Sequence, residues 1–292
     1  MNFGGLDLAY PTFEEATFIV MPVPYDLTST YQSGARRGPS AILEASGHME
    51  LYDEELRRET YLAGIYTQPA LEADARGPAE MMVSVRQAVA EVLSYNKIPV
   101  VLGGEHSISF GVVQAMKDKY PGISVLQLDA HADLRNYYQC SPFGHASVGR
   151  RISEVCPLIQ AGIRSMSAEE AAFLLDGSVK SFSADFILGE PGWQEKICEH
   201  IQGDVYLTID IDVLDPSIMP STGTPEPGGI LWRDVLRLVK ELSGRCRVRG
   251  FDVVELSPIP GMVAPDFLAA KLVYRIMGYL MEKNTKNPGI DK

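Results

Sequence analysis

The sequence places side chains that bind metals or carry protons at alternate positions directly after an apolar run. Residues 123–128 read ISVLQL, and Asp129, His131 and Asp133 follow within the segment DAHAD. If the run is a β-strand, these three side chains point to the same side of its end, because side chains alternate along a strand. Burying them there is costly without a partner. The spacing therefore predicts that either water or a metal ion reaches this strand end.

Three further apolar runs end in residues of the same kinds. GGEHS brings His106 to the end of one run, VYLTIDID ends in Asp210 and Asp212, and VRGFDVVEL ends in Asp252 and Glu255. Taken singly, each has a structural explanation, such as a hydrogen-bonded core histidine, a turn former or a helix cap. Together they favour a shared site, because ligands of parallel α/β folds gather beyond the carboxyl ends of the strands.

Metal ions would resolve the charge conflict that such a shared site creates. Carboxylates packed together repel one another, and the repulsion raises their pKa values. Two divalent cations would balance four aspartates, and imidazole with carboxylate ligands suits Mn²⁺, and less specifically Fe²⁺, Co²⁺, Ni²⁺ or Zn²⁺. We predict a binuclear site whose ligands are His106, Asp129, His131, Asp133, Asp210 and Asp212.

The elements that must position these residues alternate between β-rich runs and amphipathic stretches. The expected strands cover residues 17–23, 61–67, 98–104, 123–131, 157–164, 179–185, 205–212 and 248–256. The expected helices cover residues 78–95, 107–120, 232–244 and 266–281. Near-continuous apolar strands alternating with helices indicate a parallel sheet that is buried on both faces. The pattern does not distinguish an open sheet from a closed barrel.

Composition indicates an ordinary globular protein and excludes several partners. The 292 residues are 46% hydrophobic and 22% charged, and no linker divides them, so we expect a single domain over residues 1–292. The net charge of −12 argues against nucleic acid as a partner and slightly favours a small cationic substrate.

The sequence also predicts a cytoplasmic protein with reduced thiols. The N-terminus lacks the pattern of a signal peptide, and no apolar run approaches the roughly 20 residues of a membrane span. The cysteines are scattered and form no C-x-x-C pair: Cys140, Cys156, Cys198 and Cys246.

Several motifs, in their order along the chain, resemble the ureohydrolase family of arginases and agmatinases. They are GGEHS, DAHAD, IDIDVLDPSIMPSTGTPEPGG and DVVELSP, with SGARRGPSAI and AGIRS as further matches, and the resemblance runs from about residue 17 to about residue 282. It implies a three-layer, single-domain α/β fold with an eight-stranded, mainly parallel open sheet flanked by helices, and not a barrel. It also implies two Mn²⁺ ions and a homo-oligomer, either a trimer or a hexamer.

The resemblance further implies how the six ligands are shared. His106 and Asp133 would bind the first ion, and His131 and Asp212 would bind the second. Asp129 and Asp210 would bridge the two ions.

Catalytic roles follow by the same resemblance for Asp133, His145 and Glu255. The expected reaction is hydrolysis of a guanidinium group by water that the metals acidify, with Asp133 passing a proton to the leaving amine. Glu255 would pair with the guanidinium, and His145 would carry protons or steady the leaving group. Their structural alternatives are a salt bridge to an arginine for Glu255 and a helix-start residue for His145. We expect Asp252 to orient a ligand and Thr224 to touch the guanidinium end.

The expected substrate is agmatine, which would yield urea and putrescine. Arginases carry an NTP-like stretch after DAHxD for the amino-acid head, whereas this chain has LRNYY, although Ser141 precedes His145. Glu105 in GGEHS and the stretch TPEPGG match the agmatinases. Aminopropylagmatine, carboxyaminopropylagmatine, guanidinobutyrate and arginine remain alternatives, and Arg135 or Arg150 could meet a carboxylate.

Rival classes are a one-zinc deacetylase, a two-metal phosphoesterase and a non-catalytic interaction protein on the same fold. The complete ligand set argues against the first and the third, and no basic pattern suited to phosphate supports the second. The remaining residues that we weighed are expected to be structural: His48, Met166, His200, Asp215 and Met219.

Overall fold

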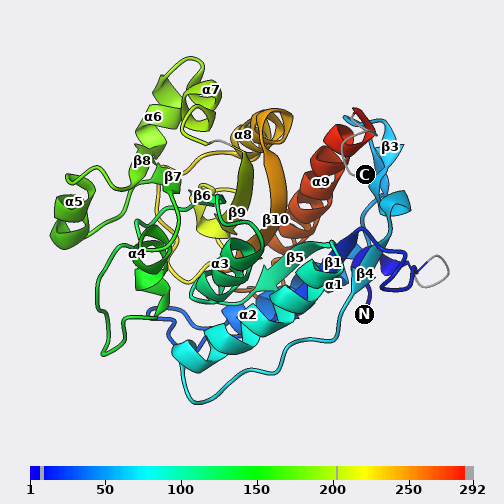
Figure 1. Cartoon of the computed structure of the whole chain (residues 1–292), viewed down its shortest axis with the longest axis horizontal. Helices are drawn as coiled ribbons and strands as arrows, with labels where there is room; N and C mark the ends of the chain where they lie inside the picture. The colour runs from blue at the N-terminus through cyan, green and yellow to red at the C-terminus, as the bar shows by residue number, and fades with distance from the viewer. Residues whose placement is uncertain (7–9, 202, 287–292) are drawn as a thin grey trace.

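The computed structural model describes residues 1–6, 10–201 and 203–286. In this part of the chain, eight strands form one sheet, with every neighbouring pair parallel (Figure 1). In spatial order they are β4 (Ile65–Thr67), β1 (Phe18–Val23), β5 (Ile98–Gly103), β10 (Arg247–Val254), β9 (Asp204–Asp210), β6 (Ser124–Leu128), β7 (Leu158–Ile163) and β8 (Lys180–Ser183). The sheet ends at two edge strands, so it is open and not a barrel.

Helices cover both faces of the sheet and make three layers. One face packs against α2 (Pro78–Ser94), α3 (Ile108–Lys119) and α4 (Val148–Ser153), with α5 (Ala168–Leu174) beside them. The other packs against α1 (Gly38–Ser46), α6 (Ala184–Gly189), α7 (Trp193–Cys198), α8 (Trp232–Arg245) and α9 (Ala264–Lys286). This architecture confirms the predicted fold class.

The strands are apolar throughout because each buries both of its sides. On β5, Val100 and Leu102 belong to one core and Val101 belongs to the other, as the alternation of side chains along a strand requires. The helices instead bury one stripe. In α8, Val235, Val239 and Leu242 recur with helical spacing and are completely buried.

One predicted strand is shorter than the sequence suggested. Residues 61–67 were expected to be extended, but Thr60–Ala63 form a 3₁₀ turn and only Ile65–Thr67 pair with β1. Gly64 separates the two with φ of +79°, a conformation that strands do not use. The other predicted strands and the helices at 78–95, 107–120, 232–244 and 266–281 are confirmed, with shifts of a few residues at their ends.

The sheet order brings the four ligand-bearing strands together. β5, β10, β9 and β6 are direct neighbours, although β9 and β10 come about 80 residues or more later in the chain than β6. Their ends are level, since Val254 pairs with Asp210 and Leu128 pairs with Ile209. The chain segments that follow these strands therefore meet at one rim of the sheet.

A small hairpin lies apart from the main sheet. Its strands, β2 (Tyr52–Asp53) and β3 (Arg58–Glu59), are antiparallel, and α9 packs against the turn that follows them. Among the described helices, none has the length and apolar character needed to cross a membrane.

Candidate metal centre and active site

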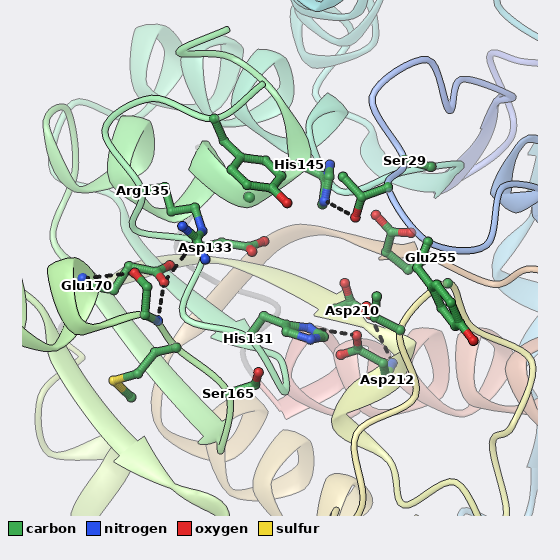
Figure 2. Close-up of a pocket in the computed structure, with 18 of the residues that line it drawn as sticks. Ser29, His131, Asp133, Arg135, His145, Ser165, Glu170, Asp210, Asp212 and Glu255 are labelled. Carbon is green, nitrogen blue, oxygen red and sulfur yellow. Dashed lines mark hydrogen bonds and ion pairs between the residues drawn. The ribbon is translucent and has the colours of Figure 1, made fainter. Parts of the chain in front are cut away.

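The structure brings the six predicted ligands together at the rim formed by β5, β10, β9 and β6. Figure 2 shows His131, Asp133, Asp210 and Asp212 around one space, with His145 and Glu255 facing it from the other side. All six predicted ligands are buried except His131, whose side chain is partly exposed.

Three carboxylates surround the ring of His106. Its Nδ1 atom lies 3.1 Å from Asp129 Oδ2, and 3.4 Å from both Asp133 Oδ2 and Asp210 Oδ2. In the described structure this buried nitrogen makes no hydrogen bond of acceptable geometry, despite the oxygens around it. A cation between these atoms would use all of them.

A second group forms around His131. Its Nδ1 atom lies 2.9 Å from Asp212 Oδ2 and 3.7 Å from Asp129 Oδ1. Asp129 therefore presents one oxygen to each histidine. Candidate ligand atoms lie within 4.8 Å of one another in two sets that share this residue, namely His106, Asp129 and Asp210, and Asp129, His131 and Asp212.

The nitrogen and oxygen atoms of these sets fit two divalent cations of the Mn²⁺ class. The pKa values of the candidate ligands also indicate that this cluster of carboxylates needs positive charge. Burial opposes protonation of His106 and His131, yet the neighbouring aspartates raise the pKa of both rings far above the usual value. Burial, Asp212 and Asp129 raise the pKa of Asp210 well above that of a free carboxyl. Without metals, the cluster balances its charge by holding protons.

Local turns hold the carboxylates where the strands end. The backbone N–H of His131 donates to Asp129 Oδ1 at 2.6 Å, and that of Asp212 donates to Asp210 Oδ1 at 2.9 Å. Asp133 has φ of 51° and Glu255 has φ of 65°, in the left-handed region. Such a conformation costs about 1 kcal/mol or more for a non-glycine residue and recurs at functional sites.

Polar partners inside the sheet orient the candidate ligands. Thr208 links His106 to the sheet, since its hydroxyl lies 2.9 Å from His106 Nε2 and donates to Asp252 Oδ1 at 2.6 Å. Asp252 thus acts through a threonine and lies within β10, not at the rim. On β6, Gln127 donates to Asp129 Oδ2 at 2.7 Å and accepts a hydrogen bond from Gln160. Sequence analysis missed the two glutamines, although both stand out as polar residues in apolar strands.

The rim opens into a cavity of about 220 Å³, which the candidate catalytic residues border. Burial and Asp129 raise the pKa of Asp133 to about 7, and burial and Glu105 raise that of Glu255 to about 8. Burial, His131 and His106 lower the pKa of His145 to about 4. Glu255 Oε1 accepts a hydrogen bond of 2.7 Å from the backbone N–H of His106. Thr224 also borders the cavity.

Part of the cavity lining comes from residues that sequence analysis did not select. Ser29, Thr30, Tyr31 and Gln32 follow β1 and line the cavity, and Glu170 lines it from the start of α5. The rule that sites lie beyond strand ends, applied to residues 17–23, would have identified the first four. Glu170 has no such signal in the sequence, because it does not directly follow a strand. In the structure its side chain accepts a hydrogen bond from the backbone N–H of Leu134.

One methionine is not a packing residue as predicted. Met219 is completely buried, but Met166 is 44% exposed and borders the cavity. His48 and His200 are exposed, and Asp215 accepts hydrogen bonds in a turn, as expected.

Arginines near the site pair within the protein. Arg135 lies 3.9 Å from Glu170 and over the ring of Tyr138, and Arg150 pairs with Glu154. Ser141 accepts a hydrogen bond from the backbone of Phe143.

A three-layer α/β fold with two ligand sets sharing one aspartate, over a cavity with buried acid–base groups, defines a candidate binuclear metal hydrolase. The family model of the arginase family matches residues 16–278, and the chain belongs to this family. An N(1)-aminopropylagmatine ureohydrolase from Synechocystis sp. is 38% identical over 95% of this chain and 94% of its own length.

Two further relatives give the same result. An agmatinase from Bacillus anthracis is 33% identical over 86% of this chain and 87% of its own length. The crystal structure of an agmatine ureohydrolase from Thermoplasma volcanium superposes with a TM-score of 0.90 at 30% identity, over 98% of this chain and 96% of the other.

Proposed function

We propose that this chain is a ureohydrolase that releases urea from an agmatine-type guanidine, with agmatine yielding urea and putrescine. The observation that carries this proposal is the common cavity. The two ligand sets that share Asp129 meet Glu255 and His145 there, so a guanidinium held by Glu255 would face both metal positions.

The proposed cofactor is a pair of Mn²⁺ ions. His106 with Asp133 would hold one ion, His131 with Asp212 the other, and the remaining two aspartates, Asp129 and Asp210, would bridge them. The placement of Asp129 between the two histidines supports its part of this assignment. When bound, the ions would supply an acidified water molecule and neutralise the carboxylates.

Glu255 is the proposed guanidinium-binding residue. One of its oxygens accepts a hydrogen bond from the backbone N–H of His106, which fixes the carboxyl group at the cavity wall. Burial raises its pKa, and a bound guanidinium would favour the ionised form because opposite charges at short range lower a carboxyl pKa. A planar cation and a carboxylate can then form two parallel hydrogen bonds. Thr224 borders the same cavity.

Asp133 is the proposed proton carrier of the reaction. Its carboxyl faces His106 at the rim and also borders the cavity. A pKa near the working pH allows one group both to accept a proton and to release it, and the pKa of Asp133 is raised to about 7. In this proposal Asp133 takes the proton of the attacking water and delivers it to the leaving amine, while His145 assists that transfer from the opposite wall.

A second candidate substrate is N(1)-aminopropylagmatine. Relatives with this activity in their names, from Synechocystis sp. and Thermus thermophilus, are 38% and 39% identical, compared with 33% for the agmatinase of Bacillus anthracis. The compound presents the same guanidinium end and adds a distal propylamine. Carboxyaminopropylagmatine, guanidinobutyrate and arginine receive less support, because Arg135 is already paired with Glu170 and Tyr138.

Urea release from Mn²⁺-loaded protein tests the function. The substrates are agmatine, N(1)-aminopropylagmatine, guanidinobutyrate and arginine, with Glu255→Gln as the inactive control. We expect urea release from agmatine or its aminopropyl derivative to be at least 100-fold faster than from arginine. This ratio corresponds to a difference of roughly 2.7 kcal/mol in activation free energy. Absence of urea from all of them would refute the proposal.

We also propose a cytoplasmic homo-oligomer, a trimer or a hexamer, on the basis of the family resemblance. Light scattering coupled to gel filtration would give the assembly mass, and a monomer at micromolar concentration would contradict this part.

A further inference from the structure

A chain of hydrogen bonds connects the buried carboxyl of Glu105 to the ring of His145. The hydroxyl of Thr28 donates to Glu105 Oε1 at 2.6 Å, and the same hydroxyl oxygen lies 3.3 Å from His145 Nδ1. Glu105 is completely buried and does not border the cavity, whereas His145 does. Thr28 is therefore the link between an interior carboxyl and a candidate catalytic ring.

Glu105 is held firmly enough to determine where the threonine hydroxyl points. Its backbone N–H donates to the carbonyl of Tyr25 at 2.7 Å, and its side chain accepts hydrogen bonds of 2.6 Å from both Ser107 Oγ and the backbone N–H of Thr28. The preceding Gly104 allows this approach, because a Cβ atom there would lie 2.0 Å from the carbonyl oxygen of Tyr25. The backbone segments that follow β1 and β5 are thus hydrogen-bonded to each other next to the Glu105 side chain.

The hydrogen count at Thr28 then determines the state of the imidazole. A hydroxyl has one hydrogen, and Thr28 donates it to Glu105. The backbone N–H of His145 already donates to the same oxygen at 3.1 Å. The oxygen can offer His145 Nδ1 only a lone pair, so the hydrogen of this contact must come from the ring. In a neutral imidazole, the other nitrogen, Nε2, is then the acceptor.

We propose that Glu105 and Thr28 are positioning residues that hold His145 in the tautomer with hydrogen on Nδ1 and a lone pair on Nε2. This assignment goes beyond the proposed function but rests on it for its catalytic meaning. At rest, His145 accepts a proton at Nε2 and cannot donate one there. The hydroxyl of Thr30, which lines the cavity, lies 3.5 Å from Nε2.

A direct test is ¹⁵N NMR of histidine-labelled protein loaded with diamagnetic Mg²⁺, with the His145 signals identified by their loss in His145→Ala. The expected spectrum shows a protonated Nδ1 and an unprotonated Nε2 for His145. The opposite tautomer would overturn the proposal, whether or not the protein hydrolyses guanidines.

Glu105→Gln reverses the polarity of the chain while keeping its shape. The amide oxygen must take the position that receives the Thr28 N–H, so the amide NH₂ faces the hydroxyls of Thr28 and Ser107. The Thr28 hydrogen then turns to His145 Nδ1, and the ring should move to the Nε2–H tautomer. An unchanged tautomer in this variant would contradict the proposed chain.

Kinetics of the Mn²⁺-loaded enzyme provide the second test. Thr28→Val should lower kcat about 10- to 100-fold, the usual cost of losing a partner that orients a functional group, with KM changed less than about 3-fold. Thr28→Ser keeps the hydroxyl and should recover kcat to within about 3-fold of wild type. Bound manganese, measured by mass spectrometry, should be the same in all three proteins.

A double-mutant cycle separates positioning from a general structural effect. In a His145→Ala background, Thr28→Val should change kcat less than about 2-fold, because residues that act through one another are not additive. Additive losses would overturn the proposal while leaving the ureohydrolase function intact. If the wild-type protein releases no urea from any guanidine, the function fails and the NMR result alone decides the tautomer.

Discussion

Two regions of this protein crowd carboxylates together, and they differ in whether the chain supplies the compensating cation. In the first region, α9 brings the almost completely buried Arg275 to three successive acids near the hairpin. Its guanidinium lies 2.5 Å from Asp53, 2.7 Å from Glu54 and 2.7 Å from Glu55. Lys240 lies 2.7 Å from Glu55 and Lys271 lies 4.0 Å from Glu54, so three cations of the chain face these three acids.

The second region is the rim of the sheet, where the acids outnumber the cations that the protein provides. Four aspartates and Glu255 meet two histidines there, and the cavity lining also includes Arg135, which lies 3.9 Å from another acid, Glu170. Burial and like charges raise the pKa of Asp210, whereas a backbone hydrogen bond and Arg275 lower that of Glu54. Clustered acids alone therefore do not mark a site; a missing internal cation does.

The largest effect that would sharpen this contrast is expected for Asp129→Asn. This residue faces both histidines, so losing its charge should remove at least one metal ion and lower kcat by about 1,000-fold or more, since metal ions supply several kcal/mol of transition-state stabilisation. Metal stoichiometry by mass spectrometry and urea release would be measured together. Full activity with two bound ions would show that the shared-ligand assignment is wrong.

The next effect concerns the other cluster. Arg275→Met should lower the free energy of unfolding by about 3–5 kcal/mol, because it leaves carboxylates uncompensated around a buried position. The folded variant should still bind metal as the wild type does. Arg237→Met is the matched control, since Arg237 is 62% exposed and 3.8 Å from Asp234, and it should cost less than about 1 kcal/mol. Equal losses in the two variants would contradict the structural role of Arg275.

Metal removal should affect only the rim. Saturating a site at about 100 times its dissociation constant stabilises the native state by about 2.7 kcal/mol, so chelation should lower the melting temperature of wild type and of Arg275→Met by similar amounts. Asp129→Asn should respond much less. Calorimetry with and without Mn²⁺ gives these values, and a chelator response in Asp129→Asn as large as that of wild type would point to a site elsewhere.

The smallest expected effect is the pH dependence that His145 contributes. The native pKa of His145 is lowered to about 4, below its value of about 6.5 in the unfolded chain. As pH falls from about 6.5 to 4, the unfolded state therefore takes up a proton that the native state refuses, and native stability declines. Allowing for partial exposure of the ring, His145→Asn should relieve this loss by about 1 kcal/mol in metal-free protein. Unfolding curves at pH 7 and pH 4.5 would measure it, and parallel behaviour of variant and wild type would exclude the effect.

The convergence of the candidate ligands was predictable because their signals in the sequence are local. In DAHAD and IDID, polar residues two apart follow an apolar strand, and the alternation of side chains does the rest. The limits of β4 were less predictable. The sequence of residues 61–67 suggests one extended strand, but Gly64, with a positive φ, ends a turn within it. The Arg275 cluster carries no local signal either, since its arginine and its acids lie more than 200 residues apart.

The sequence by itself determined the fold class, the strands that carry ligands, and the chemical type of the site. Tertiary structure alone decided that β10 and β9 lie between β5 and β6, which brings the atoms of each candidate ligand set within 4.8 Å of one another. It also decided that the segment after β1 closes the cavity and that Thr28 lies between Glu105 and His145. The physical reason is that side-chain alternation acts between neighbours along the chain, whereas strand order and cavity walls depend on pairings between residues far apart in sequence.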